Sequence, residues 1–577
     1  MDYKSIYNEW LENPYFDDET KAELKAIEND EKEIEDRFYK ELAFGTAGLR
    51  GVIGAGTNRM NFYTVRKATQ GLADYIIKMK GQKKGVAIAY DSRHMSPEFA
   101  DAAALCLNAN GIKAYVFDEL RPTPELSFAV RELGCISGIN VTASHNPSEY
   151  NGYKVYWEDG AQITPPHDEG IMDAVNKVGI TDAKTMDKEE AIEKGLYVQI
   201  GEDIDARYME ELKKLVKNPD SIERAQKDIH IVYTPLHGAG NKSVRRILKE
   251  LGFENVHVVP EQELPDGDFP TCPYPNPETP QAFELAVKLG REVGADILLA
   301  TDPDADRLGV YLKGRKPGKY HALTGNMSGC LLAEYELSQM KIAGTLPDDG
   351  EFIKTIVSTN MANDIAGFYG VKLVECLTGF KYIGQQIKRM EDTGKGHFCF
   401  GFEESYGCLV GTHARDKDAV VASMALCEAV AYCKTQGMSL WDKLKEMYER
   451  YGYWKDGTES IELKGKEGVE KIASTIDNLR HNVPTEIGGY KVLKTRDYQM
   501  NTIRDMVTGK MSHTGLPESN VLYYELEGGA WVAIRPSGTE PKLKFYYGIR
   551  GNSFADGEEK IKELGKSTVD MVHSMMK

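Results

Sequence analysis

Short apolar runs separated by longer polar stretches form a pattern that occurs three times along the chain. The first occurrence has apolar runs at residues 86–90, 112–117 and 135–141. The second has them at 229–233, 256–259 and 295–300, and the third at 352–357, 371–374 and 397–400. Strand-like runs that alternate with helical segments predict strands joined by helical crossovers. We therefore predict an α/β fold with three similar α/β domains, whose sheets are mixed and largely parallel.

The last part of the chain has a different pattern, in which strand-like runs are followed by helical ones. Strands are predicted at 460–463, 521–526 and 531–534, and helices at 468–479 and 556–572. This order predicts a separate C-terminal α+β domain. The predicted domains are residues 1–205, 206–318, 319–455 and 456–577.

Two further segments have helical patterns. The highly charged residues 17–41 place Leu24, Ile27, Ile34 and Phe38 at helical spacing, which predicts one amphipathic helix that packs on the body of the protein. Residues 419–432 are strongly apolar but too short to span a bilayer, so we expect a buried helix there.

Composition and charge restrict the class of protein. The 577 residues include 71 Lys and Arg against 89 Asp and Glu, a formal net charge of −18. This charge disfavours nucleic-acid binding but allows a local basic pocket for a small anion. Nine cysteines without a CxxC pair are typical of a protein in a reducing compartment, where cysteines pack as small buried hydrophobic residues. With no signal-peptide pattern at the polar N-terminus, we expect a cytoplasmic protein without a membrane partner.

An acidic cluster follows the last predicted strand of the second α/β domain. Asp302, Asp304 and Asp306 alternate, so a loop that curls once can direct all three carboxylates at one hard cation. The competing EF-hand hypothesis fails, because its sixth and twelfth positions would be Arg307 and Lys313 instead of Gly and Glu. Three carboxylates with space for a phosphate oxygen favour Mg²⁺, and an acidic surface turn is the alternative.

Ser144 and His145 occupy the corresponding place in the first α/β domain. A serine needs a base, a metal or a phosphate donor to become reactive, and no GxSxG elbow surrounds Ser144. Taken alone, the segment is also compatible with a plain capped turn. A phosphorylated Ser144 would supply an oxygen ligand to a cation held by the three aspartates.

Other polar clusters contain donors and acceptors for a sugar phosphate. Arg535 and its neighbours form a compact anion receptor or a simple turn, and Arg50 lies in a similar glycine-rich segment. Glu403 and Ser405 are placed to bind adjacent sugar hydroxyls, although a lone Glu-Glu-Ser would normally lie on the surface. Lys154, Arg415 and Lys417 are each candidates to bind a phosphate or move a proton, or else solvated side chains.

Five motifs, in their order along the chain, resemble those of the α-D-phosphohexomutase superfamily. They are GTAGLRG at 45–51, TASHNP at 142–147, DPDADR at 302–307, GFEESYG at 401–407 and RPSGTEPK at 535–542. The resemblance covers residues 44–550 and is strongest to the branch of phosphoglucomutases and phosphopentomutases. It implies four domains around one central cleft, each of which contributes a loop.

The resemblance also implies a role for each matching residue. Ser144 matches the phosphoserine that donates and recovers the phosphoryl group, and Asp302, Asp304 and Asp306 match the ligands that bind one Mg²⁺ together with it. The matching basic residues close to the transfer are Arg50, His145, Lys154 and Lys417, of which Lys417 is the preferred general acid/base. The matching substrate-binding residues are Arg307, Glu403, Ser405, Arg415, Arg535, Ser537, Gly538 and Thr539.

These matches predict interconversion of glucose 1-phosphate and glucose 6-phosphate, with glucose 1,6-bisphosphate as intermediate and activator. The only expected partner is the sugar phosphate, and the expected state is a monomer or weak homodimer. Ala47 replaces the Ser of many family members, which resembles the branch with phosphopentomutase and glucose-1,6-bisphosphate synthase activities, so either activity is an alternative. Phosphomannomutase activity is a further alternative, although the Glu-Glu-Ser sequence at 403–405 favours glucose over mannose. A sugar-phosphate sensor without catalysis is the alternative from another class.

Overall fold

The structure is a computed structural model that describes residues 2–45, 48–463, 465–537 and 542–576. The chain divides into two compact units. The first unit contains Met1–Gly325, Phe380–Gly401 and Ser405–Ser439, and the second contains Asn326–Gly379, Phe402–Glu404 and Leu440–Lys577. Each unit is described by itself.

The first sheet of the first unit has the strand order β1-β5-β4-β2-β3-β6. Strand β2 pairs in parallel with β3 and β4, whereas β5 pairs antiparallel with β4 and β1. The strands are β1 (Gly48–Val52), β2 (Val86–Tyr90), β3 (Ala114–Phe117), β4 (Ser137–Val141), β5 (Tyr150–Trp157) and β6 (Tyr197–Ile200). The associated helices are α4 (Phe62–Lys78), α5 (Ser96–Ala109), α6 (Thr123–Glu132), α7 (His167–Val175) and α8 (Lys188–Glu193). The sheet is mixed, as the sequence predicts.

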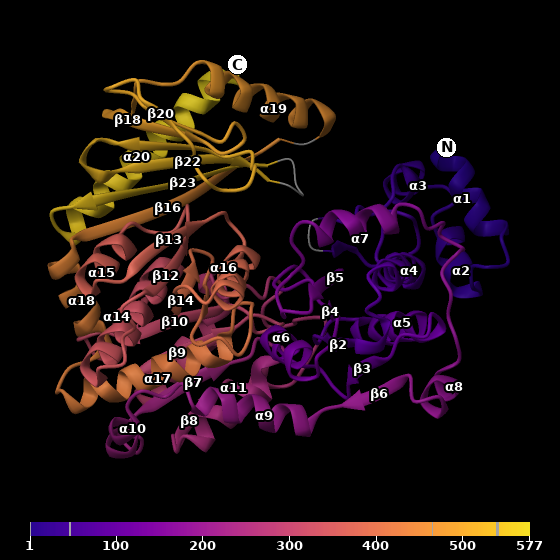
Figure 1. Cartoon of the computed structure of the whole chain (residues 1–577), viewed down its shortest axis with the longest axis horizontal. Helices are drawn as coiled ribbons and strands as arrows, with labels where there is room; N and C mark the ends of the chain where they lie inside the picture. The colour runs from indigo at the N-terminus through magenta and orange to yellow at the C-terminus, as the bar shows by residue number, and fades with distance from the viewer. Residues whose placement is uncertain (1, 46–47, 464, 538–541, 577) are drawn as a thin grey trace. The chain divides into compact units, whose positions relative to one another are not determined.

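The second sheet of this unit repeats that arrangement with the order β11-β10-β9-β7-β8 (Figure 1). Strand β7 pairs in parallel with β8 and β9, and β10 pairs antiparallel with β9. The strands are β7 (His230–Thr234), β8 (Asn255–Val258), β9 (Ile297–Thr301), β10 (Leu308–Lys313) and β11 (Tyr320–Ala322). The helices are α9 (Glu202–Lys213), α10 (Pro219–Ala225), α11 (Gly240–Glu250), α12 (Pro260–Glu263) and α13 (Glu284–Val293).

The third α/β segment supplies elements to both units. In the first unit it contributes α16 (Phe380–Thr393), β15 (Gly407–Leu409) and α17 (Ala419–Thr435), and β14 spans His397–Glu403. In the second unit β12 (Gly350–Thr355) pairs in parallel with β13 (Lys372–Cys376). The helices α14 (Gly325–Ala343), α15 (Met361–Tyr369) and α18 (Leu440–Tyr451) complete this segment.

The C-terminal domain is β-rich, and its central strands follow the order β16-β23-β22-β21-β18-β19-β20 with antiparallel neighbours. Its strands are β16 (Tyr453–Glu462), β17 (Glu486–Ile487), β18 (Tyr490–Asp497), β19 (Thr502–Asp505), β20 (Met511–Ser512), β21 (Leu522–Leu526), β22 (Trp531–Pro536) and β23 (Lys542–Gly551). Two long helices, α19 (Gly465–His481) and α20 (Phe554–Met575), accompany the sheet. The predicted α+β domain is confirmed.

The prediction of one helix over residues 17–41 is wrong, because two helices form there. Helix α2 covers Asp18–Ala26 and α3 covers Glu31–Phe38. The break has a local cause, since the Asp30 side chain accepts a hydrogen bond from the backbone N–H of Glu33 and starts a new helix. A further helix, α1 (Tyr3–Glu12), precedes them.

The amphipathic character of this charged segment is nevertheless confirmed. Leu24, Ile34 and Phe38 are buried in one cluster with Trp10 of α1 and Tyr63 of α4. Figure 1 shows α1–α3 as a group at the N-terminal end. The segment therefore packs on the first α/β domain through this cluster.

Helix α17 and the cysteines also match expectation. Residues Ala419–Ala431 of α17 are buried without exception. Throughout the described ranges, no helix is both long and apolar enough to cross a bilayer. All nine cysteines are buried.

Candidate active site

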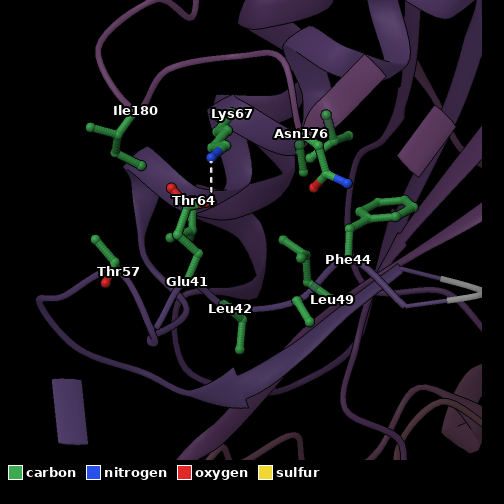
Figure 2. A pocket seen from close by; sticks show the side chains of 12 residues that line it. Glu41, Leu42, Phe44, Leu49, Thr57, Thr64, Lys67, Asn176 and Ile180 are labelled. Atoms are coloured by element: carbon green, nitrogen blue, oxygen red, sulfur yellow. Dashed lines mark hydrogen bonds and ion pairs between the residues drawn. The ribbon is translucent and has the colours of Figure 1, made fainter. Parts of the chain in front are cut away.

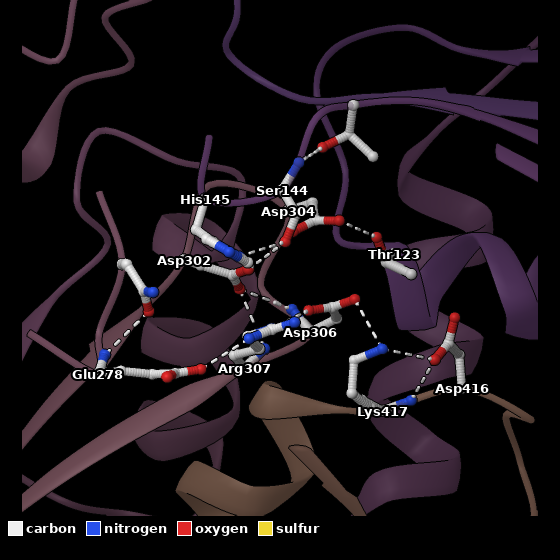
Figure 3. A network of polar contacts seen from close by, with 12 residues as sticks. Thr123, Ser144, His145, Glu278, Asp302, Asp304, Asp306, Arg307, Asp416 and Lys417 are labelled. Atoms are coloured by element: carbon white, nitrogen blue, oxygen red, sulfur yellow. Dashed lines mark hydrogen bonds and ion pairs between the residues drawn. The ribbon is translucent and has the colours of Figure 1, made fainter. Parts of the chain in front are cut away.

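Two loops that follow buried strands meet in the first unit. Strand β4 ends at Val141, three residues before Ser144, and β9 ends at Thr301, directly before Asp302. The Ser144 hydroxyl donates a hydrogen bond of 2.7 Å to Asp302 Oδ2 (Figure 3). The two loops predicted to act together therefore lie in direct contact.

The acidic loop curls in the way that its spacing predicts. Ala305 adopts a left-handed φ of 52°, and the backbone N–H groups of Asp306 and Arg307 donate to Asp302 Oδ1 at 3.1 and 3.0 Å. Asp302, Asp304 and Asp306 are buried, and one oxygen of each lies within 4.8 Å of the others. This turn converts alternating positions in sequence into one cluster of carboxylates.

Lysines balance part of the negative charge. Lys154 Nζ donates to Asp304 Oδ2 at 2.8 Å, and Lys417 Nζ lies 3.1 Å from Asp306 Oδ2. Oδ1 of Asp304 and Oδ1 of Asp306 are buried and accept no hydrogen bond from the described residues. Buried carboxylate oxygens that accept no hydrogen bond fit a hard divalent cation such as Mg²⁺.

The pKa values of the carboxyl groups reflect this crowding. Burial, together with the neighbouring Asp304 and Asp306 carboxylates, raises the pKa of Asp302 well above its usual range. Burial also disfavours ionisation of Asp304, but Lys154 and hydrogen bonds outweigh it and lower the pKa of that carboxyl. Within the cluster, the ionised form is therefore most favoured at Asp304, the carboxylate beside Lys154.

Thr123 at the start of α6 fixes Asp304 from the first α/β domain. Its hydroxyl donates to Asp304 Oδ2 at 2.9 Å, and its backbone N–H donates to the carbonyl of Asp304 at 2.8 Å. Asn140 in turn donates to the Thr123 hydroxyl at 2.6 Å. No spacing rule in the sequence pointed to Thr123, because its role depends on how two domains pack.

His145 lies beside the reactive serine. Its Nδ1 is 3.3 Å from Ser144 Oγ, and its ring packs edge-on against Tyr274. Burial, and then the positive charges of Arg307 and Arg50, lower the pKa of His145 well below its usual range. The imidazole is therefore neutral at physiological pH and acts as a hydrogen-bonding group.

Lys417 contacts two carboxylates. Its ammonium lies 3.1 Å from Asp306 Oδ2 and 3.1 Å from Asp416 Oδ1. Asp416 also accepts a hydrogen bond of 2.9 Å from the Tyr156 hydroxyl. Asp416 was not among the predicted site residues, although its position next to Lys417 was a signal.

The structure separates the predicted arginines into two kinds. Arg50 donates to Asn146 Oδ1 at 3.3 Å, and Arg307 donates to Glu278 Oε1 at 2.7 Å, so both stand near the serine and acidic loops. Arg415 is fully buried, paired with Glu391 and hydrogen-bonded to backbone carbonyls of its own loop. The contacts of Arg415 are those of a residue that shapes its loop.

Most of the predicted sugar and phosphate ligands lie in the second unit. Glu403 is buried, and Arg535 donates to the Thr378 hydroxyl. The backbone N–H of Ser537 donates to the carbonyl of Lys542 at 2.8 Å. Ser405 is half-buried and belongs to the first unit. Gly538 and Thr539 lie outside the described residues, as does Ala47.

A separate cavity of about 240 Å³ lies in the first α/β domain (Figure 2). Its walls include Leu42, Phe44, Leu49 and Val175, and Lys67 forms an ion pair of 2.7 Å with Glu41 at its edge. None of the predicted site residues lines this cavity. It is therefore distinct from the serine–aspartate site.

Comparison with known proteins places the chain. Models of the phosphoglucomutase/phosphomannomutase family match it in three parts: domain I at residues 41–181, domain II at 206–315 and domain III at 324–451. A phosphoglucomutase of Staphylococcus haemolyticus is 37% identical over 90% of this chain and 92% of its own. One from Staphylococcus aureus is 36% identical over 94% and 96%.

Solved structures show the same fold at lower identity. Parafusin of Paramecium, described as a phosphoglucomutase and crystallised in an open form, superposes with a TM-score of 0.68 at 19% identity, covering 93% of this chain and 96% of its own. A phosphoglucomutase/phosphomannomutase family protein of Burkholderia thailandensis gives a TM-score of 0.65 at 19% identity, covering 92% and 98%. With its three matching domain models and its relatives of similar length, this chain belongs to the phosphoglucomutase/phosphomannomutase family of phosphohexomutases.

Proposed function

We propose that this protein is a phosphoglucomutase, which interconverts glucose 1-phosphate and glucose 6-phosphate through a phosphoserine at Ser144. The observation that carries the proposal is the 2.7 Å contact between Ser144 Oγ and Asp302 at the edge of a buried carboxylate cluster. Relatives named phosphoglucomutase at 36–37% identity support the choice of reaction.

In the proposed first half-reaction, the bond between Ser144 Oγ and phosphorus breaks while a hydroxyl oxygen of the sugar forms a bond to the same phosphorus. The Lys417 ammonium gives a proton to the leaving Ser144 Oγ and takes up the sugar hydroxyl proton, so Ser144 is released as a hydroxyl and the product is glucose 1,6-bisphosphate. In the second half-reaction the other phosphoryl group moves to Ser144 Oγ, while Lys417 protonates the released sugar oxygen and takes up the proton of the Ser144 hydroxyl. Atoms and charges balance over the two steps.

Asp302, Asp304 and Asp306, with a phosphoryl oxygen on Ser144, are the proposed holders of one Mg²⁺. When bound, the cation supplies electrostatic stabilisation to the phosphoryl group in transfer. Lys154, Arg50 and neutral His145 are proposed to donate hydrogen bonds to the phosphoryl oxygens, since such donors stabilise the charge of this transition state.

The remaining residues have proposed roles in binding. Arg307 is proposed to release Glu278 and to bind substrate in its place. Arg415 is proposed to keep its loop in shape. Family resemblance assigns the binding of sugar hydroxyls to Glu403 and Ser405. It assigns the non-reacting phosphate to Arg535, Ser537, Gly538 and Thr539. The division into domains at residues 205, 318 and 455 is part of the same proposal.

The experiment that tests this function measures the phosphoryl group directly. Intact-mass analysis after incubation with glucose 1,6-bisphosphate should show a gain of about 80 Da, which glucose 1-phosphate plus Mg²⁺ removes. Ser144→Ala should abolish the mass gain and the turnover, whereas Ser148→Ala, four residues away, should retain both. Full turnover by Ser144→Ala would overturn the mechanism, and a mass gain without turnover would support the sensor hypothesis.

A substrate panel separates the remaining enzymatic alternatives. Turnover of glucose 1-phosphate, ribose 1-phosphate and mannose 1-phosphate is compared at equal activator concentration. The proposed function predicts the highest kcat/KM for glucose 1-phosphate. A clear preference for ribose or mannose 1-phosphate, or net accumulation of the bisphosphate, would replace it by the corresponding mutase or synthase.

A further inference from the structure

We propose that Arg93 and Asp91 are positioning residues for Ser144, and that they hold its loop in the conformation that directs Ser144 Oγ at the acidic cluster. Asp91 and Arg93 directly follow β2, the strand beside β4, so they lie at the same sheet edge as Ser144. The inference rests on the proposed role of Ser144 as the phosphoryl carrier. It concerns residues that do not themselves contact the reacting atoms.

Arg93 binds the serine loop through backbone carbonyls. Its guanidinium donates to the carbonyl oxygens of Ser144 at 2.6 Å, Pro147 at 2.7 Å and Tyr150 at 3.1 Å, and also to that of Asn146. The side chain is buried, with 1% of its surface exposed. A planar guanidinium has donors that diverge toward several acceptors, which a lysine ammonium at a single point does not provide.

Asp91 binds the other side of Ser144 through a hydroxyl. Asp91 Oδ2 accepts a hydrogen bond of 2.6 Å from the Thr142 hydroxyl, and that hydroxyl oxygen accepts one of 2.8 Å from the backbone N–H of Ser144. Asp91 also faces Arg93, with Oδ2 at 3.3 Å from Nε. Both backbone polar groups of Ser144 are therefore tied to one buried ion pair.

The backbone of Ser144 needs such support. Its φ of 53° lies in the left-handed region, which costs a non-glycine residue about 1 kcal/mol or more. Several carbonyl oxygens of the loop also converge on one point, where their dipoles repel one another without a cation. Arg93 offsets both costs, and the resulting conformation places Ser144 Oγ 2.7 Å from Asp302.

The second α/β domain covers this arrangement. Phe269, in the segment between α12 and α13, is fully buried, and its ring centre lies 5.0 Å from the guanidinium carbon of Arg93. Next to Phe269, Asp268 Oδ1 lies 2.7 Å from His94 Nε2, a hydrogen-bonding distance. A ring over the guanidinium keeps water away from it, so its hydrogen bonds to the loop carry their full strength.

The decisive experiment uses Arg93→Lys in the full chain. We expect kcat to fall about 10²-fold with KM within about threefold, because misplacing a reacting group by about 1 Å has that effect. The rate at which glucose 1,6-bisphosphate phosphorylates Ser144, followed by intact mass, should fall by a similar factor. Arg59→Lys is the matched control, since Arg59 is a buried arginine of the same domain that donates to the carbonyls of Asp36 and Asn58.

A second pair of variants keeps the proposal testable if Arg93→Lys does not fold. Thr142→Val removes the hydroxyl between Asp91 and Ser144, and Thr142→Ser keeps it. We expect Thr142→Val to slow phosphorylation of Ser144 about tenfold at nearly unchanged melting temperature, and Thr142→Ser to restore it.

Two outcomes overturn the inference. One is a folded Arg93→Lys protein whose kcat and phosphorylation rate stay within threefold of the wild-type values. The other is equal slowing in Thr142→Val and Thr142→Ser. Neither outcome touches the proposed function, which is tested separately by the turnover of Ser144→Ala and by the substrate panel.

Discussion

Two loops of this protein, the serine loop of the first unit and the Arg535 loop of the second, differ in the burial and the contacts of their arginine. Arg93 is buried, and its donors are directed at backbone carbonyls of the chain itself. Arg535 is half-buried at the end of β22 and donates to the Thr378 hydroxyl. An atom that must react requires a rigid backbone around it, whereas an arginine that is proposed to bind a phosphate needs donors that can turn toward a ligand. The following predictions test that distinction.

The largest effect is expected at the acidic cluster. Asp304→Asn removes one of three clustered charges and leaves Lys154 beside a neutral amide, so turnover should fall about 10³-fold, equivalent to several kcal/mol of transition-state stabilisation. Mg²⁺ affinity, measured by titration calorimetry, should fall as well. Asp296→Asn at the opposite end of β9 is the control and should keep turnover within twofold. Unchanged Mg²⁺ affinity in Asp304→Asn would contradict the assignment of the cation site.

At the Arg535 loop the effect should be on binding. Arg535→Gln loses a charge-assisted hydrogen bond to phosphate, about 1.5–3 kcal/mol, so KM for glucose 1-phosphate should rise about 10- to 100-fold. Because this contact is proposed to act equally on bound substrate and transition state, kcat should change less than KM. Steady-state kinetics of Arg535→Gln and Arg535→Lys measure both. A loss confined to kcat would place Arg535 with the reacting groups.

A buried carboxyl group in the second unit is predicted to make stability depend on pH. Asp456 on β16 has its pKa raised to about 7 by burial, whereas the unfolded value is near 3.8. The folded state therefore holds a proton that the unfolded state releases, so stability is highest below the unfolded pKa and decreases as pH rises toward 7. Between pH 5 and 7 the free energy of unfolding of this unit should fall by about 2 kcal/mol.

Asp456→Asn provides the comparison for that measurement. Denaturant unfolding at pH 5, 6, 7 and 8 should show a flatter pH dependence in the variant than in the wild type. Identical pH profiles for wild type and Asp456→Asn would show that Asp456 is ionised throughout.

The smallest effect is expected at the cavity of the first domain. Lys67 pairs with Glu41, whose side chain is 62% exposed, so solvent screens the interaction. Glu41→Gln should change the free energy of unfolding by less than about 1 kcal/mol and turnover by less than about twofold. A larger loss of turnover would connect this cavity with the adjacent segment that carries Arg50.

The comparison with the sequence shows why some of these features were predictable. Strand β2 has the predicted bounds, because a run of apolar residues flanked by polar ones defines a buried strand locally. The cluster of Asp302, Asp304 and Asp306 was predictable from spacing alone, since one turn brings alternate residues together. The helix break at Asp30 was missed, because the apolar residues keep their helical spacing on both sides of this capping residue.

Other features had no local signal. Thr123 and Phe269 contact residues about 180 positions away, Asp304 and Arg93 respectively, and neither has a neighbour in sequence that indicates its role. Arg415 was predicted to bind substrate, but its buried pairing with Glu391 depends on the packing of α16 beside its loop. The contacts of Thr123 and Phe269 arise only when separate domains are brought together, and that of Arg415 depends on packing within the third α/β segment.

The sequence by itself determined the three α/β cycles, the position of reactive residues after strand ends, and the family to which the motifs belong. Those properties depend on local patterns of polarity and on spacing within one turn. Only the tertiary structure decided that Ser144 faces Asp302, that Lys154 and Lys417 divide the charge of the acidic cluster, and that Arg93 holds the serine loop. The physical reason is that distances and burial of charge between distant segments follow from packing, which no local pattern contains.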